Sequence, residues 1–197
     1  MLQGRYGCMV TVTKKGVGLD EMVKRLKKLE ALRACVGITA EDTERQDDEI
    51  NNASLLYIQT HGVRKKSMRD EMQAKMDEGF KYSEAFSMYI HSHGSPLWQV
   101  PPRPVIEPAI KDAHKQIAER IGKAAHAAID GNDAEMEHWI DSAGQYGEKA
   151  SLKWFQNPKN NWPPNAPSTI RKKKSNVPLI DTSDLYKSIH HVIRRVK

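Results

Sequence analysis

The feature that most constrains the fold is a pair of long apolar stripes in the second half of the chain. In both, apolar or small residues recur every three or four positions, and Gly131 separates the two runs. This spacing places each set on one face of an α-helix, so we predict two amphipathic helices, the second capped by Asp133. Small side chains in the second stripe predict a close approach between the two helices. The stripes are Ile110, Ala113, Ile117, Ile121, Ala124 and Ala128, then Met136, Ile140, Ala143, Gly147, Ala150 and Trp154, with Gly144 as a further small residue.

Four closely spaced prolines, Pro101, Pro102, Pro104 and Pro108, lead into this helical pair. Because proline disfavours helix in the residue before it, we predict an extended strut that ends where Pro108 begins the first long helix. The strut consists of Pro101, Pro102, Arg103 and Pro104.

Shorter elements surround the pair. Alternating β-branched residues predict a strand at residues 9–13, and apolar residues at spacings of three and four predict a helix at residues 19–34. Residues 35–38 form a second predicted strand, and residues 50–62 a short helix closed by a left-handed glycine. The last strand, residues 190–196, is expected to return to the sheet that residues 9–13 begin. The prediction is an α+β fold with a small mixed or antiparallel sheet packed by long amphipathic helices.

Residues 63–98 differ from their surroundings. They are rich in charge, carry four of the eight methionines, and show only broken apolar periodicity. Glycines and a proline mark both boundaries. We predict a helical arm inserted into a single domain that spans residues 1–197. Its scattered methionines and charges predict that the arm buries little apolar surface in a single copy.

Charge is distributed unevenly along a basic chain. The sequence has 31 Lys and Arg against 25 Asp and Glu, a net charge of +6. Acidic residues gather in residues 41–49, and cations in the C-terminal part of the chain. This asymmetry suits either a duplex nucleic acid, contacted through its backbone, or copies of the chain that meet with opposite patches facing. The candidate contact residues are Arg171, Lys172, Lys173, Lys174, Arg194 and Arg195.

Catalytic patterns are missing from the sequence. The histidine group His61, His91 and His93 has no carboxylate or cysteine at a ligand-like spacing. Asp181 and Asp184 have the spacing of an N-cap and a first helical turn, where carboxylates offset free N–H groups. The sequence contains no P-loop, nucleophile elbow or dinucleotide fingerprint. We expect no enzyme activity, no metal and no cofactor.

No run of the sequence approaches the roughly 20 apolar residues that span a bilayer. The first ten residues also lack the apolar stretch of a signal peptide. Cys8 and Cys35 lie beside apolar residues, which indicates small core thiols in a reducing compartment. We expect no membrane partner and a cytoplasmic start.

Three segments in this order, "NNASLLYIQTHG", "VPPRPVIEPAI" and "WPPNAPSTIRKKKSNVPLIDTSDLYKSIHHVI", resemble the tail-completion, or neck, proteins of long-tailed bacteriophages. Apart from the arm, the resemblance covers most of the chain. The sequence departs from the family pattern at Thr60, His61, Val105 and Ser183, the last of which stands where the family has glycine. The matching residues are Asn52, Ala53, Gly62, Pro102, Arg103, Pro104, Pro108, Ser168, Thr169, Ile170, Lys173, Pro178, Leu179, Ile180, Asp181, Thr182 and Leu185.

The resemblance implies a structural virion protein that forms a ring of six or twelve copies at the head-to-tail junction. Such a ring completes or terminates the tail and joins it to the DNA-filled head. Its implied partners are neighbouring neck, portal-adaptor and tail tube or sheath proteins, with genomic DNA in the lumen. The prolyl strut suits a reach onto a neighbouring subunit, and the basic run suits either the DNA channel or an acidic patch on a neighbour. The alternative is a basic accessory protein that binds duplex DNA.

Overall fold

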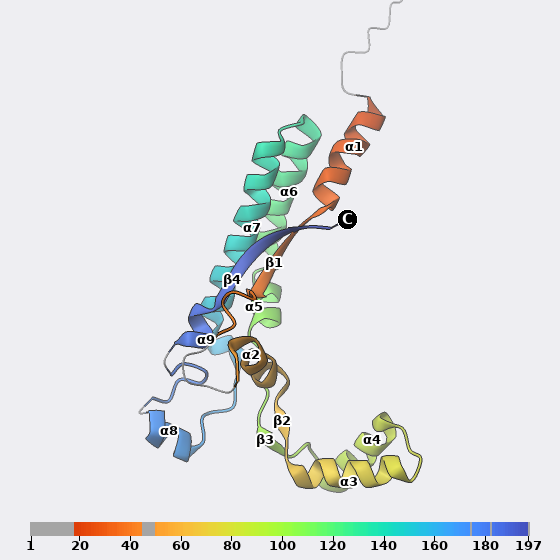
Figure 1. Cartoon of the computed structure of the whole chain (residues 1–197), viewed down its shortest axis with the longest axis vertical. Helices are drawn as coiled ribbons and strands as arrows, with labels where there is room; N and C mark the ends of the chain where they lie inside the picture. Colours follow the sequence, from red (N-terminus) through yellow and green to blue (C-terminus); the bar gives the residue numbers. More distant parts are fainter. Residues whose placement is uncertain (1–17, 45–49, 174, 182, 197) are drawn as a thin grey trace, which may run out of the picture.

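The computed structural model describes residues 18–44, 50–173, 175–181 and 183–196. The fold is α+β, as the sequence predicts. Figure 1 shows an elongated molecule in which a long helical pair forms the body, an arm protrudes at one end, and a short basic helix protrudes beside it. No helix in these described ranges is long and apolar enough to cross a membrane.

The body is built on α6 (His114–Asp130) and α7 (Asp133–Trp154), as the two apolar stripes predict. The buried face between them joins alanines of α6 to Met136 and Ile140 of α7. Asn132, and not Asp133 as predicted, caps α7, because its side chain accepts a hydrogen bond from the backbone N–H of Glu135. A separate short helix, α5 (Ile106–Asp112), precedes α6 where the sequence predicts one continuous helix.

The two glycines of α7 lie against the sheet as well as against the first apolar stripe. A side chain at Gly144 would lie 2.7 Å from the ring of His191, a sheet residue. A side chain at Gly147 would lie 2.9 Å from Ile110 of the first stripe, as predicted, and 3.0 Å from Val36 of the sheet, which was not predicted. The glycines therefore let two strands lie directly against α7.

Those strands are β1 (Leu32–Ile38) and β4 (Ile189–Arg195), which pair antiparallel with Leu32 opposite Arg195. The helix predicted at residues 19–34 ends earlier, as α1 (Leu19–Glu30). The backbone of Leu32–Ala34 instead joins the ladder with β4, a long-range pairing that outweighs the local helical pattern. The strand predicted at residues 9–13, and its pairing with β4, lie outside the described residues.

Helix α2 (Asn52–His61) ends at Gly62, whose φ is +73°. Its ψ of 171° is extended and not left-handed helical, contrary to the prediction. A Cβ at Gly62 would lie 2.8 Å from the ring of Trp98 and 2.8 Å from the carbonyl oxygen of Val100. Glycine is needed here because the chain turns directly against the strand that returns from the arm.

The arm is helical, as predicted. It leaves the body through β2 (Val63–Arg64) and returns through β3 (Trp98–Val100), which pairs antiparallel with β2. Its helices, α3 (Lys66–Asp77) and α4 (Tyr82–His93), enclose a core of their own. The expectation that the arm buries little apolar surface is wrong, because helical spacing brings four residues together in that core: Met68, Met72, Ala85 and Tyr89.

The C-terminal segment leaves the body after α7, passes through the 3₁₀ turn η1 (Pro158–Asn160) and α8 (Pro167–Lys173), and returns at α9 (Asp184–Lys187). Ser183 precedes α9 with a φ of +69°, the left-handed region that favours glycine. Asp184 lies in the first turn of α9, as predicted, but Asp181 does not cap the helix. The left-handed turn at Ser183 reverses the chain between Asp181 and α9.

Candidate assembly surfaces

The prolyl strut is fastened to its own chain through Arg103. The side chain is buried, and its guanidinium donates from Nε and Nη2 to the carbonyl oxygen of Pro163, at 3.2 and 3.0 Å, and from Nη2 to Pro164 at 3.1 Å. Its backbone N–H donates to Gln59, and Trp162 donates to the carbonyl oxygen of Pro104. Burial lowers the pKa of Arg103. The strut therefore holds the start of the segment that carries α8.

Pro101, Pro102 and Pro104 are half-buried along this strut. The described structure contains a single chain, so the predicted reach of the strut onto a neighbour stays a prediction.

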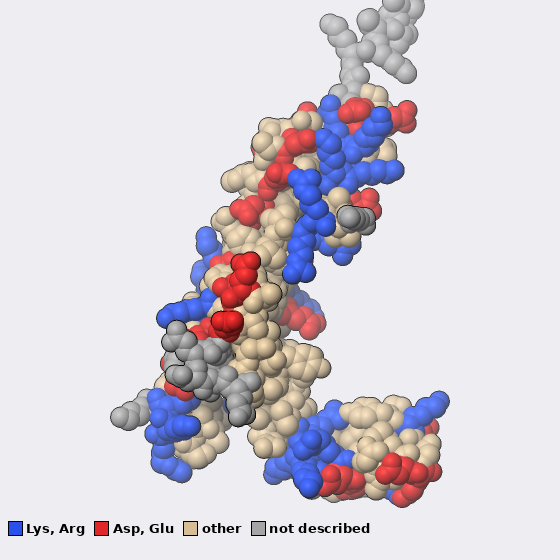
Figure 2. All heavy atoms as spheres, viewed as in Figure 1, with Lys and Arg blue, Asp and Glu red and all other residues tan. Residues whose placement is uncertain are grey.

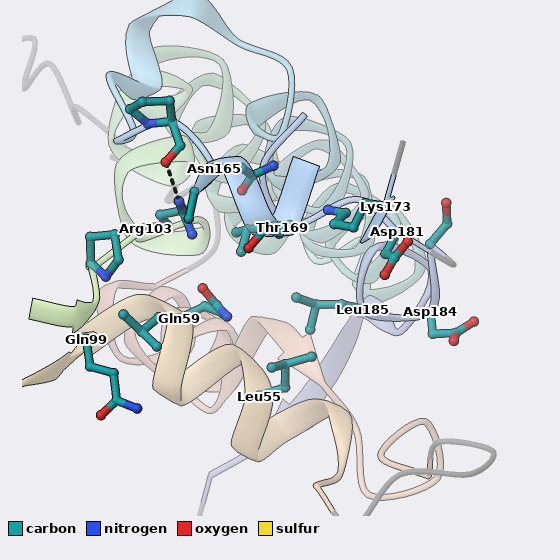
Figure 3. Close-up of a pocket in the computed structure, with 16 residues that line it drawn as sticks. Leu55, Gln59, Gln99, Arg103, Asn165, Thr169, Lys173, Asp181, Asp184 and Leu185 are labelled. Carbon is teal, nitrogen blue, oxygen red and sulfur yellow. Dashed lines mark hydrogen bonds between the residues drawn. The ribbon is translucent and has the colours of Figure 1, made fainter. Parts of the chain in front are cut away.

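A cleft of about 530 Å³ lies between the strut, α2 and the α8 segment (Figure 3). Arg103 and Lys173 approach it from one wall, Gln59 from α2, and Asp181 from the turn before α9. Burial lowers the pKa of Lys173, and the charge of Arg103 lowers it further, whereas the carboxylate of Asp181 raises it. The cleft mixes cations, carboxylates and amides, without a pair of groups arranged for proton transfer among the residues that line it.

The predicted basic residues occupy two separate places. Arg171 and Lys172 are exposed on α8, and Lys173 turns back to donate to the carbonyl oxygen of Val177 at 3.2 Å. Lys174 lies outside the described residues. Figure 1 places α8 at the end of the molecule, away from the part of β4 that carries Arg194 and Arg195. The two groups do not form one patch.

The cations of β4 differ in their surroundings. Arg195 pairs with Glu137 on α7 at 2.5 Å. Arg194 lies opposite Arg33 in the ladder, and both are exposed. Like charges that face each other across a strand pair destabilise it unless an anion or solvent screens them.

Helix α1 carries an apolar surface that the described residues leave uncovered. None of its residues is buried, and Leu19, Val23 and Leu26 are 80, 50 and 38% exposed. Only the edge of the apolar stripe contacts the body, where Leu29 packs against the core between α6 and α7. An amphipathic helix normally buries its apolar face.

An apolar groove of about 480 Å³ adjoins α1. One wall is β1, with Leu32 and Val36, and the floor is formed by isoleucines of α5 and α6, of which Ile121 is exposed. The groove and the exposed stripe of α1 place two uncovered apolar surfaces on the same part of the molecule. Exposed apolar surfaces of this kind occur at contacts with proteins, membranes or apolar ligands.

His61 lies on α2, and His91 and His93 lie on α4. His61 and His93 each donate from Nδ1 to a carbonyl oxygen of their own helix, that of Tyr57 at 2.9 Å and that of Tyr89 at 3.1 Å. Nε2 of His93 also lies 3.6 Å from Glu71. No group of ligands suited to a metal ion occurs within the described part of the chain.

Sequence reasoning missed the most tightly bound histidine. His191 lies between Asp141 and Glu148 of α7, with its backbone N–H also donating to Glu148. The signal was available only in part: carboxylates seven residues apart share one face of a helix, but nothing in the sequence pairs that face with β4. The contact joins the sheet to the helical body.

Comparisons with protein-family models, with curated proteins and with solved structures found no match to this chain.

Proposed function

We propose that this protein is a structural subunit of the head-to-tail junction of a long-tailed bacteriophage. Copies of it form a ring that completes or terminates the tail and joins it to the filled head. Its place is the virion neck, after assembly in the host cytoplasm, with neighbouring neck, portal-adaptor and tail proteins as partners and DNA in the lumen. The ordered sequence resemblance supports the phage assignment.

The observation that carries self-assembly is the uncovered apolar face of α1. The described residues of one monomer leave Leu19, Val23 and Leu26 exposed beside an apolar groove. Burying such side chains is favourable by about 1.5–3 kcal/mol each when they move from full exposure to full burial. A neighbouring copy that covers the helix and the groove would recover that free energy.

The protruding parts also support a structural role. The arm has its own small core, and α8 extends from the body with no buried residue. Both add contact surface without adding to the core of the body.

The experiment compares the association of the wild-type protein with that of a variant in which Val23 and Leu26 are both glutamate. Sedimentation velocity and negative-stain electron microscopy should show rings of the wild type and monomers of the variant. The control is Lys24→Glu, which places a carboxylate on the polar side of the same helix. A wild-type protein that stays monomeric across the micromolar range, alone and with its neck partners, would overturn the proposal.

A second function, an accessory protein that binds duplex DNA, is favoured by the exposed Arg171 and Lys172 of α8. It predicts that the isolated monomer binds duplex DNA with an affinity that falls steeply with salt, since phosphate contacts release counterions. Fluorescence anisotropy at two salt concentrations distinguishes the two functions.

A further inference from the structure

Helix α8 is held in place at both ends, although its residues are exposed or only half-buried. Arg103 binds the carbonyl groups of Pro163 and Pro164 just before the helix, and the buried Asn165 donates from Nδ2 to the carbonyl oxygen of Asn176, 3.3 Å away, just after it. The two ends of the segment are therefore tied to each other and to the strut. None of the residues of α8 is buried.

The exposed cations of α8 have no carboxylate partner within the described ranges. Arg171 and Lys172 are both exposed, whereas on the body Lys28 pairs with Asp133 and Lys159 with Asp112. Adjacent cations repel one another, and an anionic partner that faces them relieves this repulsion more than solvent does. A protruding helix that is held at both ends and presents exposed cations is suited to bind in an acidic recess.

An acidic recess of about 410 Å³ is present elsewhere on the same molecule, between the loop that follows β1, α2 and α9. Glu41, Asp42 and Glu44 line it from the loop, and Asp184 lines it from α9, with Lys187 as the one cation among its described lining residues. We call these residues the acidic hollow. Figure 2 shows acidic residues near α9 and the cations of α8 as separate groups on the same face of the molecule.

Asn52 gives a second reason to expect a donor in the acidic hollow. It lines the hollow and is only 3% exposed. Its Nδ2 donates to the carbonyl oxygens of Asp42 and Glu44, both at 3.4 Å, while its Oδ1 has no hydrogen-bond partner in the described structure. A buried acceptor without a donor is costly, and an ammonium or guanidinium group supplies donors only.

We propose that α8 of one copy docks in the acidic hollow of the next copy, with Arg171 and Lys172 facing Glu41 and Glu44. This inference rests on the proposed self-assembly and names its polar contact. The two surfaces are different patches of one chain, so the contact is heterologous, and its repetition around an axis closes a ring. A concave, anionic recess repels nucleic acid, so its occupant is a cationic surface such as that of α8.

The test exchanges the charges of the two surfaces. Variant A carries Arg171→Glu and Lys172→Glu, and variant B carries Glu41→Lys and Glu44→Lys. In each variant alone every contact sets like charges against each other, so association should weaken by about tenfold or more. In an equimolar mixture each α8 meets a hollow of opposite charge when A and B alternate, so wild-type association should return.

Sedimentation velocity and native mass spectrometry measure the outcome. A matched control, Lys115→Glu with Lys149→Glu, changes the net charge as variant A does at two exposed positions and should assemble as the wild type does. Variants A and B that assemble as well as the wild type, or a mixture that fails to recover, would overturn this inference while leaving the α1 contact standing. Normal assembly of variant A with loss of duplex DNA binding would assign α8 to DNA instead. A wild-type protein that never associates would remove both proposals.

Discussion

The imidazole of His191 lies against the carboxylate of Glu148, with 2.6 Å between Nδ1 and Oε2. Its second nitrogen, Nε2, lies 3.1 Å from Oδ1 of Asp141. Both ring nitrogens thus face carboxylate oxygens, which accept only, and an imidazole donates from both nitrogens only when it is protonated. The arrangement ties β4 to α7 most strongly when His191 carries a charge.

This geometry predicts a pH dependence of stability. Burial lowers the pKa of His191, but hydrogen bonds and charges from Glu148 and Asp141 raise it by more, so the net shift is upward from 6.5. A group with a raised folded-state pKa contributes stability that is fully present below pH 6.5 and is lost as pH rises through the folded value. As the pH rises from 6.5 through the folded-state pKa of His191, the melting temperature of the wild type should therefore fall more than the melting temperature of Glu148→Gln.

Proton NMR of the ring should show the pKa of His191 lower in Glu148→Gln than in the wild type. Glu107→Gln, an exposed carboxylate on α5, is the control and should leave the titration unchanged. An identical pKa in all three proteins would contradict the assignment.

Gly144 is predicted to be intolerant of a side chain. A Cβ there would lie 2.7 Å from Cδ2 of His191 and 3.4 Å from Cβ of Ala34. Gly144→Ala should lower the free energy of unfolding by about 1–3 kcal/mol, because the ring and the strand must shift. Gly122→Ala is the matched control, since the space at this position on α6 is open, and it should raise stability by about 0.5–1 kcal/mol. Chemical denaturation measures both free energies of unfolding. If Gly144→Ala raised stability as much as Gly122→Ala, the ring of His191 would be free to move aside, and the prediction would be wrong.

Arg103 is predicted to stabilise the α8 segment. Arg103→Lys keeps a charge but cannot donate to both proline carbonyls in the fork geometry of the guanidinium. We expect the free energy of unfolding to fall by about 1.5–3 kcal/mol, which is typical of losing hydrogen bonds from a charged group. Limited proteolysis should cut residues 163–173 faster in the variant than in the wild type, with Lys111→Arg, an exposed position, as the control. Unchanged cleavage would mean that other contacts hold the segment.

Ser183 is predicted to be improved by glycine. A φ of +69° strains a residue with a Cβ by about 1–2 kcal/mol, and glycine removes this strain. Glycine also loses more conformational entropy on folding, which offsets part of the gain. Ser183→Gly should raise the free energy of unfolding by up to about 1 kcal/mol, measured by urea denaturation. A destabilised variant would show that the serine hydroxyl matters more than the backbone.

The sequence predicts the parts of this fold whose signal is local. The stripes of α6 and α7 repeat over several turns, so the helical pair is confirmed, although the first stripe is divided between α5 and α6. Contacts between distant segments could not be predicted. Leu32 joins β1 only because β4 lies beside it, and Gly144 faces His191 and not α6. The pairing of His191 with Glu148 spans 43 positions, a separation that leaves no pattern in a single sequence.

The arm is predicted to unfold without the body when its small core is damaged. Met68 is fully buried between α3 and α4, and its replacement by alanine should cost about 2–5 kcal/mol. The arm is connected to the body through β2 and β3, and its core consists of residues of α3 and α4, so this loss should be confined to the arm. Hydrogen exchange measured by mass spectrometry should show faster exchange in residues 66–93 of Met68→Ala and unchanged exchange in α6 and α7. Met88→Ala removes a methionine that is 39% exposed on the same arm and should leave both regions as they are. Faster exchange that spreads into α7 would mean that the arm and the body fold as one cooperative unit.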